Sequence, residues 1–223
     1  MRGLGLVELM VGLTVGLIVV AGASVMMVGQ IGEHRRLMLE TQIQQDLRAA
    51  ADLMLRDLRR AGYRGRAEEA VWASGASATT ANPYAQVLSV AREGGEVNYS
   101  YSSARPDRVT TENNQVDANE RFGYRLQTGV LQFNQGGTWQ PLTDPQTLKV
   151  TDFQVRINTQ DLSLEEFCLQ PCPAAAADCP PRQLVRDVSL RIEGQAAHDK
   201  AVVRSVNLSA RLRNDAIEGS CGT

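Results

Sequence analysis

The amino-acid sequence predicts an α+β protein in which one long N-terminal helix packs on an antiparallel β-sheet head. Three observations carry this prediction: an uncharged apolar stretch near the N-terminus, an amphipathic helical pattern that follows it without a proline, and alternating apolar and polar residues in the C-terminal half. The chain has 223 residues. If roughly 30 of them belong to the segment that contains the apolar stretch, about 190 remain, which is enough for one domain with its own core.

The apolar stretch runs from Leu9 to Ile31, 23 residues without a formal charge. As a helix rising about 1.5 Å per residue it would be roughly 35 Å long, enough to cross the hydrocarbon core of a bilayer. Arg2 precedes it, so we expect the N-terminus in the cytoplasm and the rest of the chain across the membrane. The alternative is an ordinary secretory signal cut after Ala23, but this leaves Glu8 unexplained within the apolar region.

Glu8 is the carboxylate at the edge of this stretch. A charged side chain that reaches the bilayer centre costs on the order of 2.5–3.5 kcal/mol, so its presence calls for a reason. One interpretation is that Glu8 lies near the membrane surface and its side chain extends into the headgroups. The other is that the carboxylate has a partner.

The first residues favour a partner, because they resemble a type IV prepilin leader. Gly3 is followed by the apolar Leu4, Glu8 lies five residues after the glycine, and a long apolar helix follows. The resemblance implies that a prepilin peptidase cuts after Gly3 and methylates Leu4, and that Glu8 pairs with such an N-terminus during filament assembly. Leu4 and Gly5 depart from the family, in which Phe and then Thr or Ser are usual.

After the apolar stretch, charges recur every few residues and apolar residues return at helical spacing. The apolar stripe, with spacings of 4, 3, 4, 4 and 3, consists of Ile43, Leu47, Ala50, Met54, Leu58 and Ala61. We therefore predict one helix from residue 4 to about residue 61. Gly29 and Gly32 weaken the join between its halves, and Gly62 is the expected C-cap.

The end of this helix carries a second resemblance. Residues 57–64, Asp-Leu-Arg-Arg-Ala-Gly-Tyr-Arg, are similar to the end of the long helix in PilW-type minor pilins. Residues 212–214, Leu-Arg-Asn, resemble the same family more weakly. The resemblance implies a pilin-like fold, in which the second half of the helix covers one face of the sheet.

Strand periodicity begins after a small, polar loop at residues 73–83. Alternation at residues 188–192 predicts a sheet with one apolar and one solvated face. Turns are expected at Gly94–Gly95, Gly129 and Gly136–Gly137. The predicted strands are residues 85–92, 96–102, 108–112, 121–127, 130–134, 138–142 and 147–157, followed by two clearer strands around 188–192 and 206–212.

An irregular insertion at residues 158–183 contains three of the four cysteines. These are Cys168, Cys172 and Cys179, and the fourth is Cys221, near the C-terminus. All four follow the predicted membrane span, where an oxidising periplasm permits disulfides, so we expect two disulfides, with Cys221 tying the tail to the insertion. Three pairings stay open. Zinc is the alternative, but the spacing does not form two paired knuckles and no histidine lies nearby.

No pattern in the sequence indicates catalysis. We find no defensible Ser-His-Asp arrangement, no phosphate-binding loop and no calcium loop, so we expect neither an enzyme nor a cofactor or metal. The net charge of −2 gives no bulk attraction to nucleic acid, and none is predicted as a partner.

The resemblance and the layout together predict a minor pilin, a structural subunit of the priming or tip complex of a type IV pilus. Its expected partners are other minor pilins, the major pilin, the prepilin peptidase and the bacterial inner membrane, with the head in the periplasm and later in the extracellular pilus. The alternatives are a minor pseudopilin of a type II secretion system and a pilus-tip adhesion module. The predicted parts are a leader (1–3), a membrane and assembly half-helix (4–32), an amphipathic half-helix (33–66) and a β-sheet head (67–223).

Overall fold

The computed structural model describes residues 5–70, 76, 78–85, 88–91, 95–103, 112–173 and 178–222. The chain divides into two compact units, one up to Gln42 and the other from Ile43 onward. The predicted leader at residues 1–3 lies outside the described residues, and so do residues 108–111 of the predicted strand 108–112.

The long helix predicted from the sequence is present as α1, Leu6–Leu58, 53 residues in length. It continues through Gly29 and Gly32. Its end is tighter than expected, because the amides of Arg60 and Ala61 bond to carbonyls three residues back, at 2.9 Å. Gly62 has the positive φ of a helix-ending residue, +76°, but its amide donates to the carbonyl of Ser100 at 2.9 Å instead of closing the helix.

The predicted apolar stripe is the buried face of the second half of α1. Its six residues are between 0% and 6% exposed. Ala51 and Leu55, which the stripe did not include, are buried as well. The buried face of the helix is wider than the predicted stripe because this half of α1 packs against two sheets. Leu47 lies 3.4 Å from the Cβ position of Gly194 in one sheet, and Asp57 accepts a hydrogen bond from Tyr124 in the other.

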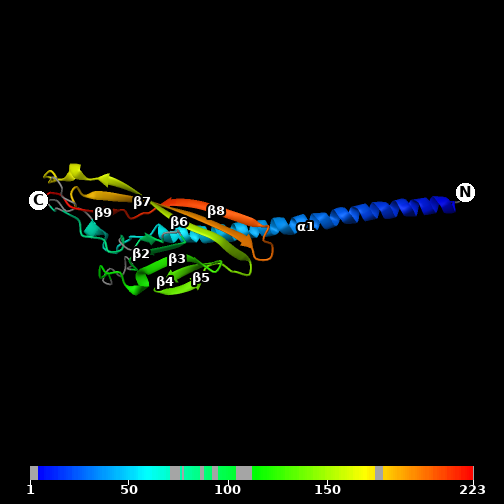
Figure 1. Cartoon of the computed structure of the whole chain (residues 1–223), viewed down its shortest axis with the longest axis horizontal. Coiled ribbons are helices and arrows are strands. Elements are labelled where there is room, and N and C mark those ends of the chain that lie inside the picture. The colour runs from blue at the N-terminus through cyan, green and yellow to red at the C-terminus, as the bar shows by residue number, and fades with distance from the viewer. Residues whose placement is uncertain are drawn as a thin grey trace. The chain divides into compact units, whose positions relative to one another are not determined.

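The first sheet has five antiparallel strands in the order β1-β2-β3-β4-β5, a meander whose later strands are green in Figure 1. The strands are β1 (Ser89–Val90), β2 (Glu96–Ser100), β3 (Arg121–Gln127), β4 (Val130–Gln135) and β5 (Thr138–Pro141). The turns predicted at Gly129 and Gly136–Gly137 are confirmed as hairpin turns, since Gln127 pairs with Val130 and Gln135 with Thr138. Of the described residues in the predicted strand 85–92, Ser89 and Val90 pair with β2, whereas residues 85, 88 and 91 lie outside the strand.

The second sheet contains β6 (Leu148–Ser163), β7 (Arg182–Ala196), β8 (Val203–Arg211) and β9 (Ala216–Glu218). β7 is central: it pairs with β6 on one side and with β8 and β9 on the other (Figure 1, yellow to red). β6 and β7 both run farther into the predicted insertion than expected, so its irregular part shortens to residues 164–181. β9 was not predicted. Its pairing with β7 spans only three residues, too few for a period to be read.

Gly194 allows α1 to approach β7 closely. A Cβ at this position would lie 2.6 Å from a methyl carbon of Leu148 and 3.4 Å from one of Leu47. The 2.6 Å contact is too short for two carbon atoms, but it involves the end of a side chain in the neighbouring strand β6, so a larger residue would first displace Leu148. The 3.4 Å distance to Leu47 is an ordinary van der Waals contact, so at this position the buried stripe of α1 packs directly on β7.

Candidate functional site

The first half of α1 carries apolar side chains around its whole circumference. Sixteen large apolar residues between Leu6 and Ile31 are at least 49% exposed in the single chain. Among the described residues, α1 is the one helix long and apolar enough to cross a membrane. Leaving so much apolar surface in water is costly, so this segment is a candidate membrane anchor and a candidate packing surface for other helices.

Glu8 lies in the first turn of α1, where its amide donates to the carbonyl of Gly5 at 3.0 Å. The side chain is exposed. The unsatisfied amides of a helix N-terminus favour a negative charge, so this placement is locally compatible with an ionised carboxylate. Gly3 and Leu4 lie outside the described residues.

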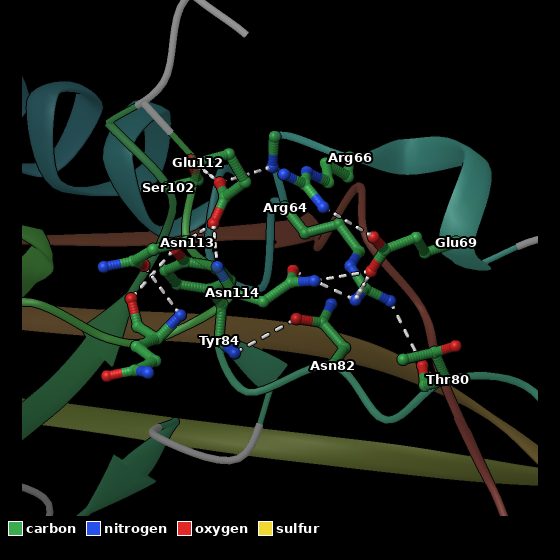
Figure 2. A network of polar contacts seen from close by, with 12 residues as sticks. Arg64, Arg66, Glu69, Thr80, Asn82, Tyr84, Ser102, Glu112, Asn113 and Asn114 are labelled. Carbon is green, nitrogen blue, oxygen red and sulfur yellow. Dashed lines mark hydrogen bonds and ion pairs between the residues drawn. The ribbon is translucent and has the colours of Figure 1, made fainter. Parts of the chain in front are cut away.

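In the head, a buried arginine gathers three segments that are distant in sequence. Arg64 is 4% exposed. Its guanidinium donates to Glu69 at 2.7 Å, to the side-chain oxygen of Asn114 at 3.2 Å and to the carbonyl of Thr80 at 3.1 Å (Figure 2). Asn114 in turn donates to Glu69 at 2.6 Å. The ion pair is thus held by a shared neutral amide, which fixes the geometry of all three groups.

A second cluster surrounds the hydroxyl of Tyr84, which is fully buried. This hydroxyl lies 2.9 Å from a carboxylate oxygen of Glu112, 3.1 Å from one of Glu120 and 3.1 Å from the carbonyl of Gln115. A phenol has one proton to donate, so it serves one of these three acceptors at a time. Burial raises the pKa of Tyr84 far above its ordinary value, and the two carboxylates add to that rise, so the phenol keeps its proton.

Both carboxylates receive further donors from nearby loops. Glu112 accepts hydrogen bonds from the hydroxyl of Ser102 and from the amides of Gly65 and Asn114, the amides at 3.1 and 2.8 Å. Burial alone would raise the pKa of Glu112, but these donors outweigh it and hold the pKa below the ordinary 4.5. Glu120 accepts from Ser103, through its amide at 2.8 Å and its hydroxyl at 3.1 Å.

These two clusters stabilise the loops of the head and provide no catalytic arrangement. Their carboxylates are occupied by donors, and Tyr84 stays protonated, so neither group is a free base or nucleophile. In the described part of the chain no three His, Cys, Asp or Glu side chains come together as a metal site.

The cysteines form two disulfides, Cys168–Cys221 and Cys172–Cys179. The first joins the insertion to the C-terminal tail, as expected, and closes a separation of 53 residues. The second closes a small loop within the insertion, with a separation of 7. The tail is also held by a hydrogen bond from the amide of Ser220 to the carbonyl of Asp178, at 2.7 Å. All four cysteines are thus used in disulfides, and no free thiol is left.

Sequence reasoning missed the two buried polar clusters. Glu112 and Glu120 look like surface residues in the sequence, because polar neighbours surround both. The one sequence signal was the stretch Glu112-Asn-Asn-Gln115, which is rich in side chains that bond to a local backbone. No sequence pattern connects that stretch to Tyr84.

An apolar N-terminal helix joined to an antiparallel sheet head with a disulfide-bearing insertion defines a pilin-like protein. The family model described as PpdB, prepilin peptidase-dependent protein B, matches residues 36–212, and the chain therefore belongs to this family. Membership implies dependence on a prepilin peptidase. The matched range leaves out Gly3, Leu4 and Glu8. No curated protein and no solved structure gives a significant match.

Proposed function

We propose that the chain is a minor pilin of the PilW type, a structural subunit of the priming or tip complex of a type IV pilus. The observation that carries the proposal is the fully apolar, exposed first half of α1 with one carboxylate, Glu8, in its first turn. Such a surface is compatible with lipid before assembly and with a bundle of similar helices afterwards. The family match, with its dependence on a prepilin peptidase, supports the same function.

Under this proposal the peptidase cuts after Gly3 and methylates the new N-terminus at Leu4. Glu8 then neutralises the methylated amine of a neighbouring subunit. In a helix bundle without water an unpaired charge is strongly unfavourable, so this pairing sets which subunits associate and in what register. The head remains on the periplasmic side of the inner membrane and becomes extracellular with the pilus.

Processing is tested by the intact mass of the protein extracted from membranes of the source bacterium. We expect a mature chain beginning at Leu4 with one added methyl group. A chain beginning at Ser24 would identify an ordinary signal peptide and overturn the pilin function.

The assembly role is tested by Glu8→Gln, which removes the charge at nearly constant size. The variant should insert and be cut normally but should co-purify poorly with the other pilins, and filament number should fall in a strain without the wild-type copy. Glu33→Gln, an exposed carboxylate on the same helix beyond the apolar stretch, is the matched control and should assemble normally. Normal assembly of Glu8→Gln would contradict the assembly role and favour the alternative, in which the Glu8 side chain only extends into the lipid headgroups.

A further inference from the structure

The head contains a positively charged pocket that neither the family description nor the proposed assembly role uses. It has a volume of about 620 Å³ and lies where the end of α1, the start of β3 and the segment after β8 meet. Arg60 and Arg213 line it together with neutral groups that include Asn119 and Gln135, and none of the described residues that line it is acidic. This is within the usual volume range of small ligand pockets, roughly 300–1,000 Å³.

Arg60 is held in place by an aromatic stack. Its guanidinium carbon lies 4.1 Å from the ring centroid of Tyr101, and Tyr101 stacks on Phe122 with centroids 4.1 Å apart and planes inclined by 8°. A guanidinium held over the face of a ring keeps N–H groups that the ring does not use, and these can bind an anion. The stack therefore orders Arg60 before any ligand arrives, which lowers the entropy cost of binding.

Arg213 is brought to the pocket by the backbone. Its amide donates to the carbonyl of Arg59 at 3.1 Å, and the next residue, Asn214, donates to the carbonyls of Arg60 and Ala61 at 3.2 and 3.1 Å. These bonds satisfy carbonyls of the turn that follows α1 and fix residue 213 beside the helix end. Both arginine side chains are exposed, and within the described part of the chain neither forms an ion pair.

Two carboxylates of neighbouring segments have other partners: Asp57 accepts a hydrogen bond from Tyr124, and Glu120 accepts from Ser103 and Tyr84. Among the described residues no carboxylate lies within ion-pair distance of Arg60 or Arg213, so both charges are available to an external anion. Two arginines suit carboxylates, which they bind with paired N–H donors, and the amides of Asn119 and Gln135 can donate to and accept from a peptide backbone.

The aromatic rings argue against a nucleic acid or a sugar. Tyr101 and Phe122 are only 8% and 5% exposed, so neither offers a free face on which a base or a sugar ring could stack. Tyr63, the other aromatic lining residue, is half-buried. Recognition in this pocket consequently depends on charge and hydrogen bonds.

We propose that this pocket is a docking site for an acidic peptide segment of a protein partner, whose carboxylates bind Arg60 and Arg213. The site lies entirely in the head, so it depends neither on processing after Gly3 nor on Glu8.

The test uses the full chain in detergent micelles and a fluorescein-labelled peptide with two adjacent glutamates, Gly-Ser-Glu-Glu-Ser-Gly, read out by fluorescence anisotropy. The peptide with glutamines in their place should bind at least tenfold more weakly. Arg60→Gln and Arg213→Gln should each weaken binding of the acidic peptide at least fivefold. Arg60→Lys should fall between wild type and Arg60→Gln, because a lysine keeps the charge but loses the planar fork.

Arg48→Gln removes an exposed arginine of α1 outside the pocket and should leave binding unchanged. Thermal unfolding of each variant checks that it is folded, and Arg213→Gln, which keeps the backbone bonds and the aromatic stack, remains informative if Arg60→Gln is not. Equal binding of the glutamine peptide, an equal loss in Arg48→Gln, or stronger competition by acetate, phosphate or a single-stranded oligonucleotide than by the unlabelled acidic peptide would each overturn the proposal.

Discussion

The hydroxyl of Tyr124 donates a hydrogen bond of 3.0 Å to the carboxylate of Asp57. Tyr124 is fully buried in β3, and Asp57 lies in the last turn of α1, 67 residues earlier in the chain. Burial, and then the charge of Asp57, raises the pKa of Tyr124, so the phenol stays a donor. This bond fixes the rotation of the helix end against the five-stranded sheet.

Tyr124→Phe should lower the free energy of unfolding by about 1 kcal/mol, the usual net value of one hydrogen bond, because Asp57 is only half-buried and can accept from water instead. The measurement is denaturant unfolding of the full chain in detergent. Tyr99→Phe is the comparison: Tyr99 is also fully buried, but its hydroxyl interacts with that of Tyr124 and has no bond to a carboxylate or backbone group in the described chain. An equal or larger loss of unfolding free energy in Tyr99→Phe would contradict the stabilising role of the bond between Tyr124 and Asp57.

Tyr84→Phe should be more destabilising than Tyr124→Phe, by about 1–3 kcal/mol in total, because it takes a donor from a buried site. Glu112 and Glu120 are 4% and 5% exposed, so water cannot readily replace the phenol. The same unfolding experiment measures the loss. Tyr63→Phe is the control and should change the free energy of unfolding little, because Tyr63 is half-buried and its hydroxyl forms no side-chain hydrogen bond within the described chain. A loss no larger in Tyr84→Phe than in Tyr63→Phe would show that the cluster adds no stability.

Acid should destabilise the head through Glu112. Folding lowers its pKa from the ordinary value that an unfolded chain retains, so its contribution to stability is complete above the unfolded value and is lost as the pH falls through the folded one. Unfolding midpoints measured across that acidic range should fall for wild type. Glu112→Gln should start less stable at neutral pH and lose less on acidification. Parallel pH profiles for the two proteins would refute the role of Glu112.

The two disulfides should contribute unequally. In the chain-entropy model a bridge across 53 residues contributes about 4 kcal/mol and one across 7 residues about 2.5 kcal/mol. Replacing both Cys168 and Cys221 by serine should therefore destabilise the chain more than replacing both Cys172 and Cys179. The free energy of unfolding of the two double variants decides it, and a larger loss from the short loop would contradict the model.

Much of the fold was predictable because its signals are local. The 23 uncharged residues of the apolar stretch fixed the first half of α1, and the spacing from Ile43 to Ala61 identified its buried face. Period-two alternation placed most strands within a few residues, and β3 was predicted with its full bounds. Periodicity works here because each pattern reports which side of an element faces away from water.

The predicted processing residues rest on the sequence alone. Gly3, Leu4 and Glu8 form a motif that a membrane peptidase and a neighbouring subunit would read, and neither partner is part of the folded chain. Their roles therefore stay predictions, because the structure of the head does not test them.

What only the tertiary structure decided are the contacts between residues far apart in the chain. It selected one cysteine pairing of three, divided the strands between two sheets, and buried Arg186 of β7 so that it donates to the carbonyls of Ala85 and Asn214 at 3.1 and 3.2 Å. It also brought Arg60 and Arg213 to one pocket. A sequence pattern shows which face of an element is apolar, but it does not show which distant segment will cover that face. Buried charges such as Glu112 are tolerated only where several distant segments together supply hydrogen bonds to them. Where such segments meet is determined by the tertiary fold alone.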